Sequence, residues 1–536
     1  MQAEFPAGAL ICCGLGAELG DLDRGRLVQA RLAGHVLFRR NVRDAAQLAA
    51  LTAELGDLTP AELPPILAID EEGGAVSRLD HLGFEAPAAL ALGATGEPAW
   101  AQEVAGLVGS TLAALGLNTV FAPCLDVLTE PLNPVIATRA YGDDPEQVTR
   151  FGLAALEGFR AAGIATVVKH FPGHGATRAD SHVAEPVVRR TAEAMAACDL
   201  APFRAAVAGG ADGVMSAHVR YPDATPEAER DLPATHSRHW LGEVLRRQLG
   251  FAGPVLSDAL EMVGAGAEAT FEQRLERSLA AGVDLLLFDE LEHGLAARDH
   301  LARLANNPRW QERLADAAAR VTSFRRRLAR RVLRASPHQT AGLHEAAGPR
   351  ELAQLLRAPE ERFAAIQSAA IALVADPRRR LPLPRSTPLL VAMPRALDAD
   401  RRIDLRWFEA QLSERFPAAR VLSFDAGPDA PALLTRAAAD AGLADASHAA
   451  VILASLGRGD TGWIRATAAA LGDGPGPRLG VALHRPAEVL EMPASWTRLI
   501  TYGFGRNALG ALIRVLAGEC AAAGNVLGLG SPVARA

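Results

Sequence analysis

Residues 164–186 read IATVVKHFPGHGATRADSHVAEP, and this stretch shows the pattern that decides the fold of the first half of the chain. The short β-branched run from Thr166 to His170 predicts a buried strand. The run ends on two polar side chains, and the Pro- and Gly-containing segment after it predicts a long loop over a pocket. Polar residues at the end of a buried strand are typical of parallel α/β sheets, which carry their functional groups at the carboxyl ends of the strands.

The same alternation of apolar runs and amphipathic helical stretches continues through roughly the first 300 residues. In the stretch from Pro145 to Ala162, Asp144 is placed to cap a helix, and Val148 and Phe151 begin its buried face. Eight β/α units predict an α/β fold of the (β/α)8 TIM-type barrel class. An open doubly wound sheet stays as the alternative, because periodicity does not reveal closure. The eight predicted strands are Ala9–Cys13, His35–Phe38, Ile66–Asp70, Thr119–Pro123, Thr166–His170, Gly213–His218, Val255–Asp258 and Leu285–Asp289.

The sequence changes character between Asn306 and Arg362, where it is rich in Arg and Ala and predicts a helical connection. We interpret the basic run from Arg325 to Val332 as the solvated face of a helix rather than as a nucleic-acid patch. The expected domains are a barrel at residues 1–335, a helical linker at 336–365 and a smaller α/β sandwich at 366–536. Six runs predict the strands of the sandwich: Ile371–Ala375, Leu389–Met393, Arg420–Phe424, Ala450–Ala454, Leu479–Leu483 and Leu499–Tyr502.

The composition of the 536-residue chain excludes several classes of protein. Hydrophobic residues make up 49% of it, which excludes intrinsic disorder, and no apolar stretch reaches the ~20 residues of a membrane span. A net charge of −7 argues against nucleic acid or an anionic membrane as the partner. Five cysteines without CxxC spacing argue against a disulfide framework and a structural zinc site, and the first residues lack the basic segment of a signal peptide. We therefore expect a cytoplasmic protein.

Lys169 is the only lysine among 55 basic residues, and the other 54 are arginine. A compact ammonium group and a planar guanidinium group are not interchangeable, so this position is a candidate for function. Lys169 also lies at a predicted strand end, as do several other polar residues. Together they predict a functional site at the carboxyl face of the barrel. The strand-end group consists of Asp70, Lys169, His170, His218 and Asp258.

The long loop after the fifth predicted strand contains a carboxylate and an imidazole at close spacing, Asp180 and His182. A carboxylate beside an imidazole holds it in one tautomer and raises its pKa, as proton transfer requires. A metal site is the alternative, because His170 and His174 in the same segment are also good ligands. A Pro-Gly pair between these two histidines prevents the helix that would align them, so we expect no metal.

Four motifs of the chain resemble motifs of family 3 glycoside hydrolases and occur in the same order as in that family. The similarity is greatest to the NagZ-type β-N-acetylglucosaminidases of the family. The resemblance spans essentially the whole predicted barrel. The second predicted domain more loosely resembles the C-terminal α/β sandwich of the family. The motifs are IDEEGG at residues 69–74 with Arg78 after it, NPVIATRAYGDDP at 133–145, KHFPGHG at 169–175 with ADSH at 179–182, and GPVLSDALEM at 253–262.

The resemblance implies a role for each matching residue. Asp258 corresponds to the nucleophile, His182 to the acid/base, and Asp180 to the partner of that histidine. Two positions depart from the usual motifs: Ala259 stands where a second Asp is common, and Cys124 stands where an aliphatic residue is usual. The residues implied to hold the terminal sugar are Asp70, Arg78, Arg139, Lys169 and His170.

The sequence and the resemblance together predict a retaining exo-β-N-acetylglucosaminidase that acts on cell-wall (muropeptide) fragments through a covalent glycosyl-Asp intermediate. The alternatives are a β-N-acetylglucosaminide phosphorylase on the same scaffold, because a histidine acid/base does not repel a phosphate dianion, and a non-catalytic sugar-binding barrel. We expect no cofactor and a carbohydrate partner, and a homodimer is left open. Because the predicted acid/base lies on a barrel loop, we expect the second domain to be dispensable for the chemistry.

Overall fold

The computed structural model describes residues 5–16, 18–60, 62–181, 184–266, 268–334, 349–397, 403–425, 429–432, 449–457 and 459–530. Its first domain is a closed barrel in which β1 to β8 follow one another in sequence order, and β8 pairs with β1. All neighbouring strands are parallel, which confirms the predicted TIM-type barrel and excludes the open sheet. Every predicted strand overlaps an observed one. The strands are β1 Ile11–Cys13, β2 Gly34–Leu37, β3 Ile66–Ile69, β4 Thr119–Val120, β5 Ala165–Phe171, β6 Gly213–Ser216, β7 Val255–Ala259 and β8 Leu285–Phe288.

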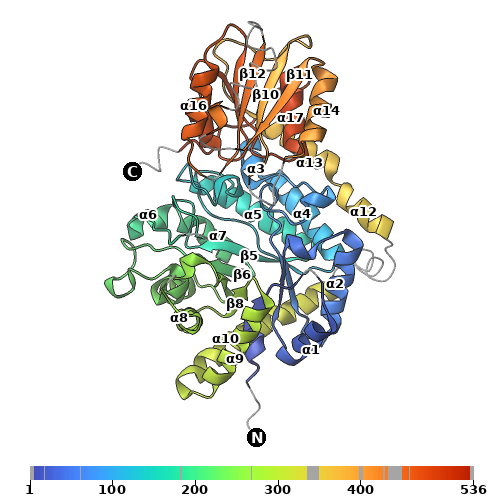
Figure 1. The fold of residues 1–536 in the computed structure, drawn as a ribbon. Coiled ribbons are helices and arrows are strands. Elements are labelled where there is room, and N and C mark those ends of the chain that lie inside the picture. Colours follow the sequence, from blue (N-terminus) through green and yellow to red (C-terminus); the bar gives the residue numbers. More distant parts are fainter. Residues whose placement is uncertain are drawn as a thin grey trace.

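Helices surround the barrel, and α5 shows why they form where they do (Figure 1). Asp144 caps α5 by accepting a hydrogen bond from the backbone N–H of Gln147 over 2.8 Å, and a proline occupies the first turn. Val148, Phe151 and Phe159 form its buried face, as predicted. The helices are α1 Asp21–Ala30, α2 Ala45–Asp57, α3 Ala89–Thr95, α4 Pro98–Ala114, α5 Pro145–Ala161, α6 Ala192–Ala197, α7 Leu200–Ala208, a helix at His239–Gln248, α8 Phe271–Ala281, α9 Leu291–Ala305 and α10 Pro308–Arg334.

The basic run on α10 is partly buried, which differs from the solvated face that the sequence predicts. Arg325 is 5% exposed and donates to the backbone carbonyls of Leu63 and Pro64 over 2.5 and 2.8 Å. Arg331 forms a bidentate ion pair with Asp212 over 2.7 and 2.9 Å. These two arginines bind α10 to loops of the barrel. Helical periodicity does not reveal such contacts, because their partners are distant in the sequence.

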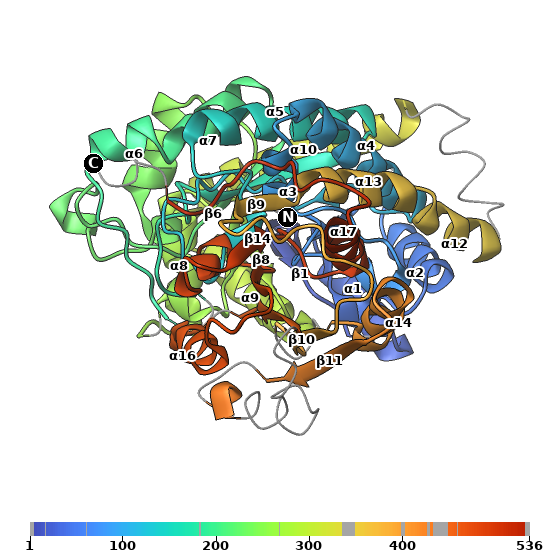
Figure 2. The ribbon, with the colours of Figure 1, turned by 90° about the horizontal axis from the view of Figure 1, so that it is seen from above.

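The second domain contains a six-stranded sheet in the order β11-β10-β12-β13-β14-β9, in which only β9 runs antiparallel to its neighbour. This confirms the predicted α/β domain. Helices α14 and α17 lie on one face of the sheet, and α16 lies on the other (Figures 1 and 2). The elements are α12 Pro349–Arg357, α13 Glu360–Ala370, β9 Ala372–Ala375, β10 Leu389–Pro394, α14 Leu405–Arg415, β11 Ala419–Phe424, β12 Ala450–Ser455, α16 Gly462–Leu471, β13 Arg478–Ala482, β14 Thr497–Ile500 and α17 Arg506–Ala517.

The two domains share one hydrophobic core cluster. It joins Leu90 of α3 and Ile136 of a barrel loop to Trp496 and Tyr502 of the second domain. The sheet therefore has one face covered by α14 and α17 and the other covered by α16 and part of the barrel. Helices α12 and α13 belong to the expected linker region and pack against the barrel core, but residues 335–348 lie outside the described part, so the domain boundary stays a prediction.

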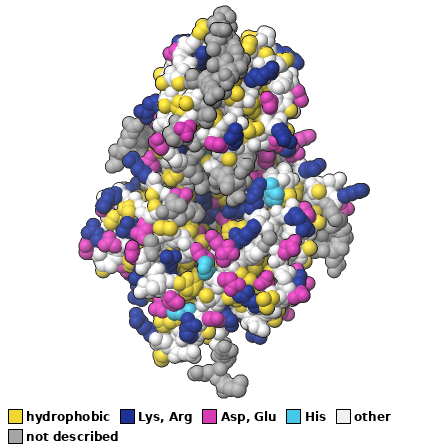
Figure 3. Space-filling view, in the orientation of Figure 1, with side chains coloured by type: hydrophobic (Ala, Val, Ile, Leu, Met, Phe, Trp, Pro, Cys, Tyr) yellow, Lys and Arg dark blue, Asp and Glu magenta, His cyan; other side chains and the backbone are white. Residues whose placement is uncertain are grey.

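The described surface carries both signs of charge. Basic and acidic side chains are interspersed over both domains on the face shown in Figure 3. Among the described helices, none combines the length and the apolar composition that crossing a bilayer requires. The five cysteines are all free thiols in the structure, and four of them are buried.

Candidate active site

A cavity of about 200 Å³ opens at the carboxyl ends of the barrel strands, where the sequence predicts the functional site. Its wall receives residues from the ends of seven strands, so no single segment builds it. Six of the eight predicted site residues line it together. The polar lining residues are Asp70, Arg78, Arg139, Lys169, His170, His174, Ser181, Asp258 and Asp289, and the apolar ones include Phe38, Phe121, Met215, Met262 and Leu287.

Lys169, at the end of β5, is 2% exposed and lies between two carboxylates. Its Nζ is 2.6 Å from Asp70 Oδ1 and 2.5 Å from Glu72 Oε1. Burial opposes the charged ammonium, but the two carboxylates outweigh this effect and raise the pKa of Lys169. A compact donor fits between two acceptors at these distances, which accounts for a lysine where every other basic residue of the chain is an arginine.

Glu72 also holds Arg139. The Nε and Nη2 atoms of this arginine each donate to the Glu72 carboxylate over 2.9 Å, in the bidentate geometry that a guanidinium favours. Burial alone would raise the pKa of Glu72, but the positive charges of Arg139 and Lys169 hold it well below its usual range. One buried carboxylate thus fixes two of the cations that line the cavity, Arg139 and Lys169.

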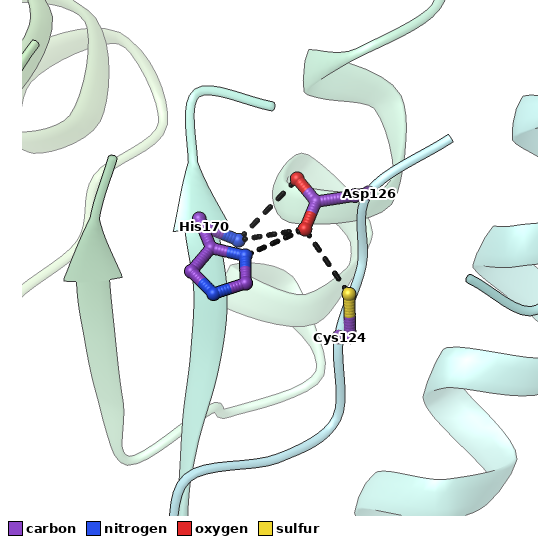
Figure 4. A group of neighbouring side chains, drawn as sticks. All are labelled: Cys124, Asp126 and His170. Carbon is purple, nitrogen blue, oxygen red and sulfur yellow. Dashed lines mark hydrogen bonds and ion pairs between the residues drawn. The ribbon is translucent and has the colours of Figure 1, made fainter. Parts of the chain in front are cut away.

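The imidazole of His170 has a defined tautomer. Its Nδ1 is 2.7 Å from Asp126 Oδ2 (Figure 4). Its Nε2 is 3.1 Å from the Nη2 donor of Arg139. Because the arginine can only donate, Nε2 must accept, and the proton lies on Nδ1. Burial raises the pKa of Asp126, but its interactions with His170 and His174 lower it to about 2. The ring of His170 is therefore held in one orientation by a buried carboxylate.

Cys124, Asp126 and His170 form the one group among the described residues whose side chains lie close enough together to hold a metal ion (Figure 4). The Asp126 oxygens already accept from the Cys124 thiol over 3.1 Å, from His170, and from the backbone N–H of His174 over 2.5 Å. A metal ion would have to displace the protons of the thiol and the imidazole. We interpret the group as a hydrogen-bonded cluster, and the expectation of no metal stays a prediction.

His174 lies beside His170, with ring centroids 5.8 Å apart, but its ring nitrogens face other partners. Nδ1 contacts Thr177 Oγ1 over 2.8 Å, and Nε2 contacts Ser181 Oγ over 3.1 Å. Burial lowers the pKa of His174 to about 4. His174 thus braces the long loop after β5.

Asp258 lines the cavity near the end of β7, and the backbone after it is held on both sides. The N–H of Ala259 donates to Asp258 Oδ1 over 2.8 Å. The carbonyl of Ala259 lies 3.1 Å from His218 Nε2, whose Nδ1 contacts Thr235 Oγ1 over 2.9 Å. His218, which follows β6, thus braces the peptide at Ala259, where the motif commonly has a second Asp. The predicted strand-end residue His218 therefore lies behind Asp258 and is not among the residues that line the cavity.

Arg78 and Asp70 come from one hairpin-like segment after β3. Arg78 Nη2 lies 3.5 Å from Asp70 Oδ2. Behind them, the buried carboxyl of Glu71 accepts from the backbone N–H groups of Arg78 and Leu79 over 2.7 and 3.2 Å. Burial raises the pKa of Glu71 to about 8. Glu71 therefore fixes the backbone that presents Arg78.

The predicted acid/base dyad is only half described. His182 lies outside the described residues. Asp180 is half-buried, and its carbonyl accepts from the N–H of Ala184 over 2.9 Å. Ser181 lines the cavity, and its carbonyl accepts from the N–H of Gly264 over 2.9 Å. The chain around the dyad therefore reaches the cavity, while the roles of Asp180 and His182 stay predictions.

Sequence reasoning missed three carboxylates of the site. Glu72 lies two residues after Asp70 in the IDEEGG motif, and a strand end with two further acids was a signal for it. Asp126 follows β4 and was not assigned a role. Asp289 directly follows β8, and burial together with the nearby charges of Glu261 and Asp258 raises its pKa to about 6.

A parallel barrel with a charged cavity at its strand ends has the architecture of an enzyme. A sequence profile described as "Glycosyl hydrolase family 3 N terminal domain" matches residues 20–324. A curated β-hexosaminidase of Thiobacillus denitrificans is 42% identical over 303 residues, which cover 55% of this chain and 82% of that protein. A second, of Hydrogenovibrio crunogenus, is 36% identical over 350 residues, covering 60% of this chain and 95% of that protein. The chain belongs to glycoside hydrolase family 3, and it is a glycoside hydrolase.

Solved structures extend the similarity to both domains. The structure of a family 3 β-N-acetylglucosaminidase from Paenibacillus sp. str. FPU-7 has a TM-score of 0.83, is 30% identical and covers 99% of each chain. A β-glucoside phosphorylase matches 100% of this chain with a TM-score of 0.75, but it is 21% identical, so that similarity concerns the fold alone.

Proposed function

We propose that the chain is a retaining exo-β-N-acetylglucosaminidase. The observation that carries the proposal is that Asp258 lines the same cavity of about 200 Å³ as the Lys169–Asp70 pair, in a chain 42% identical to a curated β-hexosaminidase. A small cavity at the barrel mouth favours the end of a saccharide over its middle. Charged donors and acceptors around it suit the hydroxyl groups of a terminal sugar.

Five polar residues of the cavity have a proposed task in sugar binding. Asp70 and the buried Lys169 form a donor–acceptor pair that binds neighbouring sugar hydroxyls, and Arg78 adds a further donor. Arg139 and His170 extend this surface, since Glu72 and Asp126 fix their orientations. Rigid groups bind a sugar at a lower entropic cost than mobile ones do.

In the proposed reaction, the Asp258 carboxylate attacks the anomeric carbon as the glycosidic C–O bond breaks, and His182 gives its proton to the leaving oxygen. Water then attacks the same carbon and loses a proton to His182, which frees Asp258 and releases the sugar with its β configuration. Asp180 is the proposed partner that keeps the histidine basic enough for the second step.

The finer substrate is proposed from the resemblance: terminal β-linked N-acetylglucosamine of muropeptide fragments. The proposed compartment is the cytoplasm, and the five free thiols support it, because such thiols persist in reducing surroundings.

The test is a slow fluorinated aryl substrate, followed by peptide mapping. We expect the sugar to be attached to the peptide that contains Ser257 and Asp258. Asp258→Asn should keep the fold and lose most turnover of aryl β-N-acetylglucosaminide, while the surface change Asp57→Asn should have no effect. A label on Asp70 or Asp289 would refute the assignment of the nucleophile.

A second experiment distinguishes hydrolysis from phosphorolysis by adding phosphate to the reaction, with sulfate as the ionic-strength control. Free N-acetylglucosamine is the expected product, and N-acetylglucosamine 1-phosphate would show a phosphorylase.

A further inference from the structure

The barrel loop that carries Arg139 lies between the cavity and the second domain. We call residues 128–140 the Arg139 loop. At one side of this loop Arg139 reaches Glu72, and it also reaches His170 in the wall of the cavity. The apolar residues of the loop belong to the core cluster shared with the second domain, which contains Leu128, Val135, Ile136 and Ala140 together with Val489, Trp496 and Tyr502. The second domain thus contributes to the burial of the apolar residues of this loop.

One polar contact joins the loop to the second domain directly beside Arg139. Thr138 Oγ1 lies 3.0 Å from His484 Nδ1. The two residues are 1% and 2% exposed, so water does not compete for this hydrogen bond. His484 follows β13, and its ring packs edge-on against Phe504 with centroids 6.2 Å apart. The contact with Phe504 therefore helps to hold the His484 ring in the orientation in which it contacts Thr138.

The Arg139 loop contains a backbone conformation that depends on contacts with its surroundings. Asn133 fixes the first part, since its Oδ1 accepts from the N–H groups of Val135 and Ile136 over 2.9 and 2.8 Å. The next residue, Ala137, has φ +41°, a left-handed conformation that a residue with a side chain rarely adopts. Such a conformation persists only where the surroundings determine it. Thr138 follows immediately, and its side chain is fixed by the second domain.

We propose that His484 of the second domain is a positioning residue for Arg139, acting through Thr138. The hydrogen bond holds the turn at residues 137–139, so that Arg139 keeps its bidentate contact with Glu72 and its contact with His170. The inference rests on the proposed function, in which Arg139 binds the terminal sugar. It assigns to the second domain a part in substrate binding, in contrast to the expectation that this domain is dispensable for the chemistry.

The experiment compares four single variants of the full chain, and the double variant Thr138→Val with His484→Leu, by steady-state kinetics on aryl β-N-acetylglucosaminide. Thr138→Val removes only the hydroxyl, and His484→Leu removes the ring nitrogen that it contacts. His484→Asn places an amide near the position of Nδ1 and should restore the contact. Arg362→Ala is the matched control, because its bidentate pair with Glu103 over 2.6 and 2.8 Å also joins the second half of the chain to the barrel but lies on the surface.

We expect Thr138→Val and His484→Leu each to raise KM about fivefold to tenfold with kcat changed less than twofold, since a displaced Arg139 weakens binding by roughly one hydrogen bond. The double variant should be no worse than either single variant. His484→Asn and Arg362→Ala should keep the KM of the wild type. Wild-type KM in Thr138→Val would overturn the inference even where His484→Leu fails to fold, and so would additive effects in the double variant.

Failure of the proposed function has a different signature. In that case the wild-type chain itself shows no turnover of the aryl substrate, and calorimetry shows no binding of N-acetylglucosamine.

Discussion

Asp126 accepts the Nδ1–H hydrogen bond of His170 over 2.7 Å, and both residues are buried. The contact decides which nitrogen of the ring carries the proton. Because Nε2 then presents a lone pair to Arg139, a carboxylate behind the cavity controls a donor in its wall. Glu72 likewise orients Arg139 and Lys169 from behind the cavity. Hydrogen bonds and ion pairs therefore connect Lys169, Arg139 and His170.

The first prediction concerns Asp126. In Asp126→Asn the amide group cannot accept from all the donors that face it, so His170 loses its fixed tautomer. We expect kcat/KM to fall by about 10- to 100-fold, which corresponds to the loss of a hydrogen bond to a charged group. Cys124→Ala, which removes the neighbouring thiol donor, is the control and should stay within about twofold. Equal losses in the two variants would show that the cluster serves packing alone.

The second prediction concerns Lys169. A guanidinium group is too large for a space in which Nζ has two carboxylate oxygens within 2.5 and 2.6 Å, so Lys169→Arg should abolish activity. The free energy of unfolding should fall by about 2–4 kcal/mol, because a buried ion network is distorted. The reverse exchange at a surface ion pair, Arg26→Lys, should change neither quantity. Urea denaturation and aryl glycoside turnover measure both. An active Lys169→Arg variant would contradict the proposed steric requirement.

The third prediction is a pH dependence of stability that arises from Glu71. Its pKa is about 8 in the folded chain and near 4.5 when unfolded. Between these values the folded chain keeps a proton that the unfolded chain releases, so its contribution to the free energy of unfolding is full below pH ~4.5 and is lost as the pH rises through 8. Glu71→Gln, whose amide oxygen still accepts from Arg78 and Leu79, should be as stable as the wild type at pH 5 and more stable at pH 9.

Thermal unfolding at several pH values checks this expectation, with the surface change Glu62→Gln as the control. A wild-type slope that Glu71→Gln leaves unchanged would show that Glu71 is ionised in the folded chain.

The fourth prediction concerns Asp289, whose pKa is raised to about 6 by burial and then by the charges of Glu261 and Asp258. Removing either charge should lower this pKa, and Glu261→Gln should lower it more than Asp258→Asn does, because its contribution is the larger. Carbon-13 NMR titration of the Asp289 carboxyl group measures the shift. An unchanged pKa in both variants would place Asp289 outside the electrostatic reach of Asp258.

The outline of the fold could be predicted because it depends on short stretches of sequence. The run around Thr166 forms β5, and Asp144 caps α5, since β-branched composition and cap chemistry act over a few residues. The burial of Arg325 was predicted wrongly for the complementary reason. Its acceptors are carbonyls 261 and 262 residues away, and no local pattern reveals them.

The sequence by itself determined that Asp70, Lys169 and Asp258 end strands, and the parallel order of those strands brings them to one face. Only the tertiary structure decided which charge meets which. Glu72 and Arg139 are 67 residues apart in the chain, and Thr138 and His484 are 346 apart. Such contacts form when the barrel closes and the second domain packs on its loop. Which side chains interact depends on their distance and burial in the folded chain, and neither quantity follows from their spacing in the sequence.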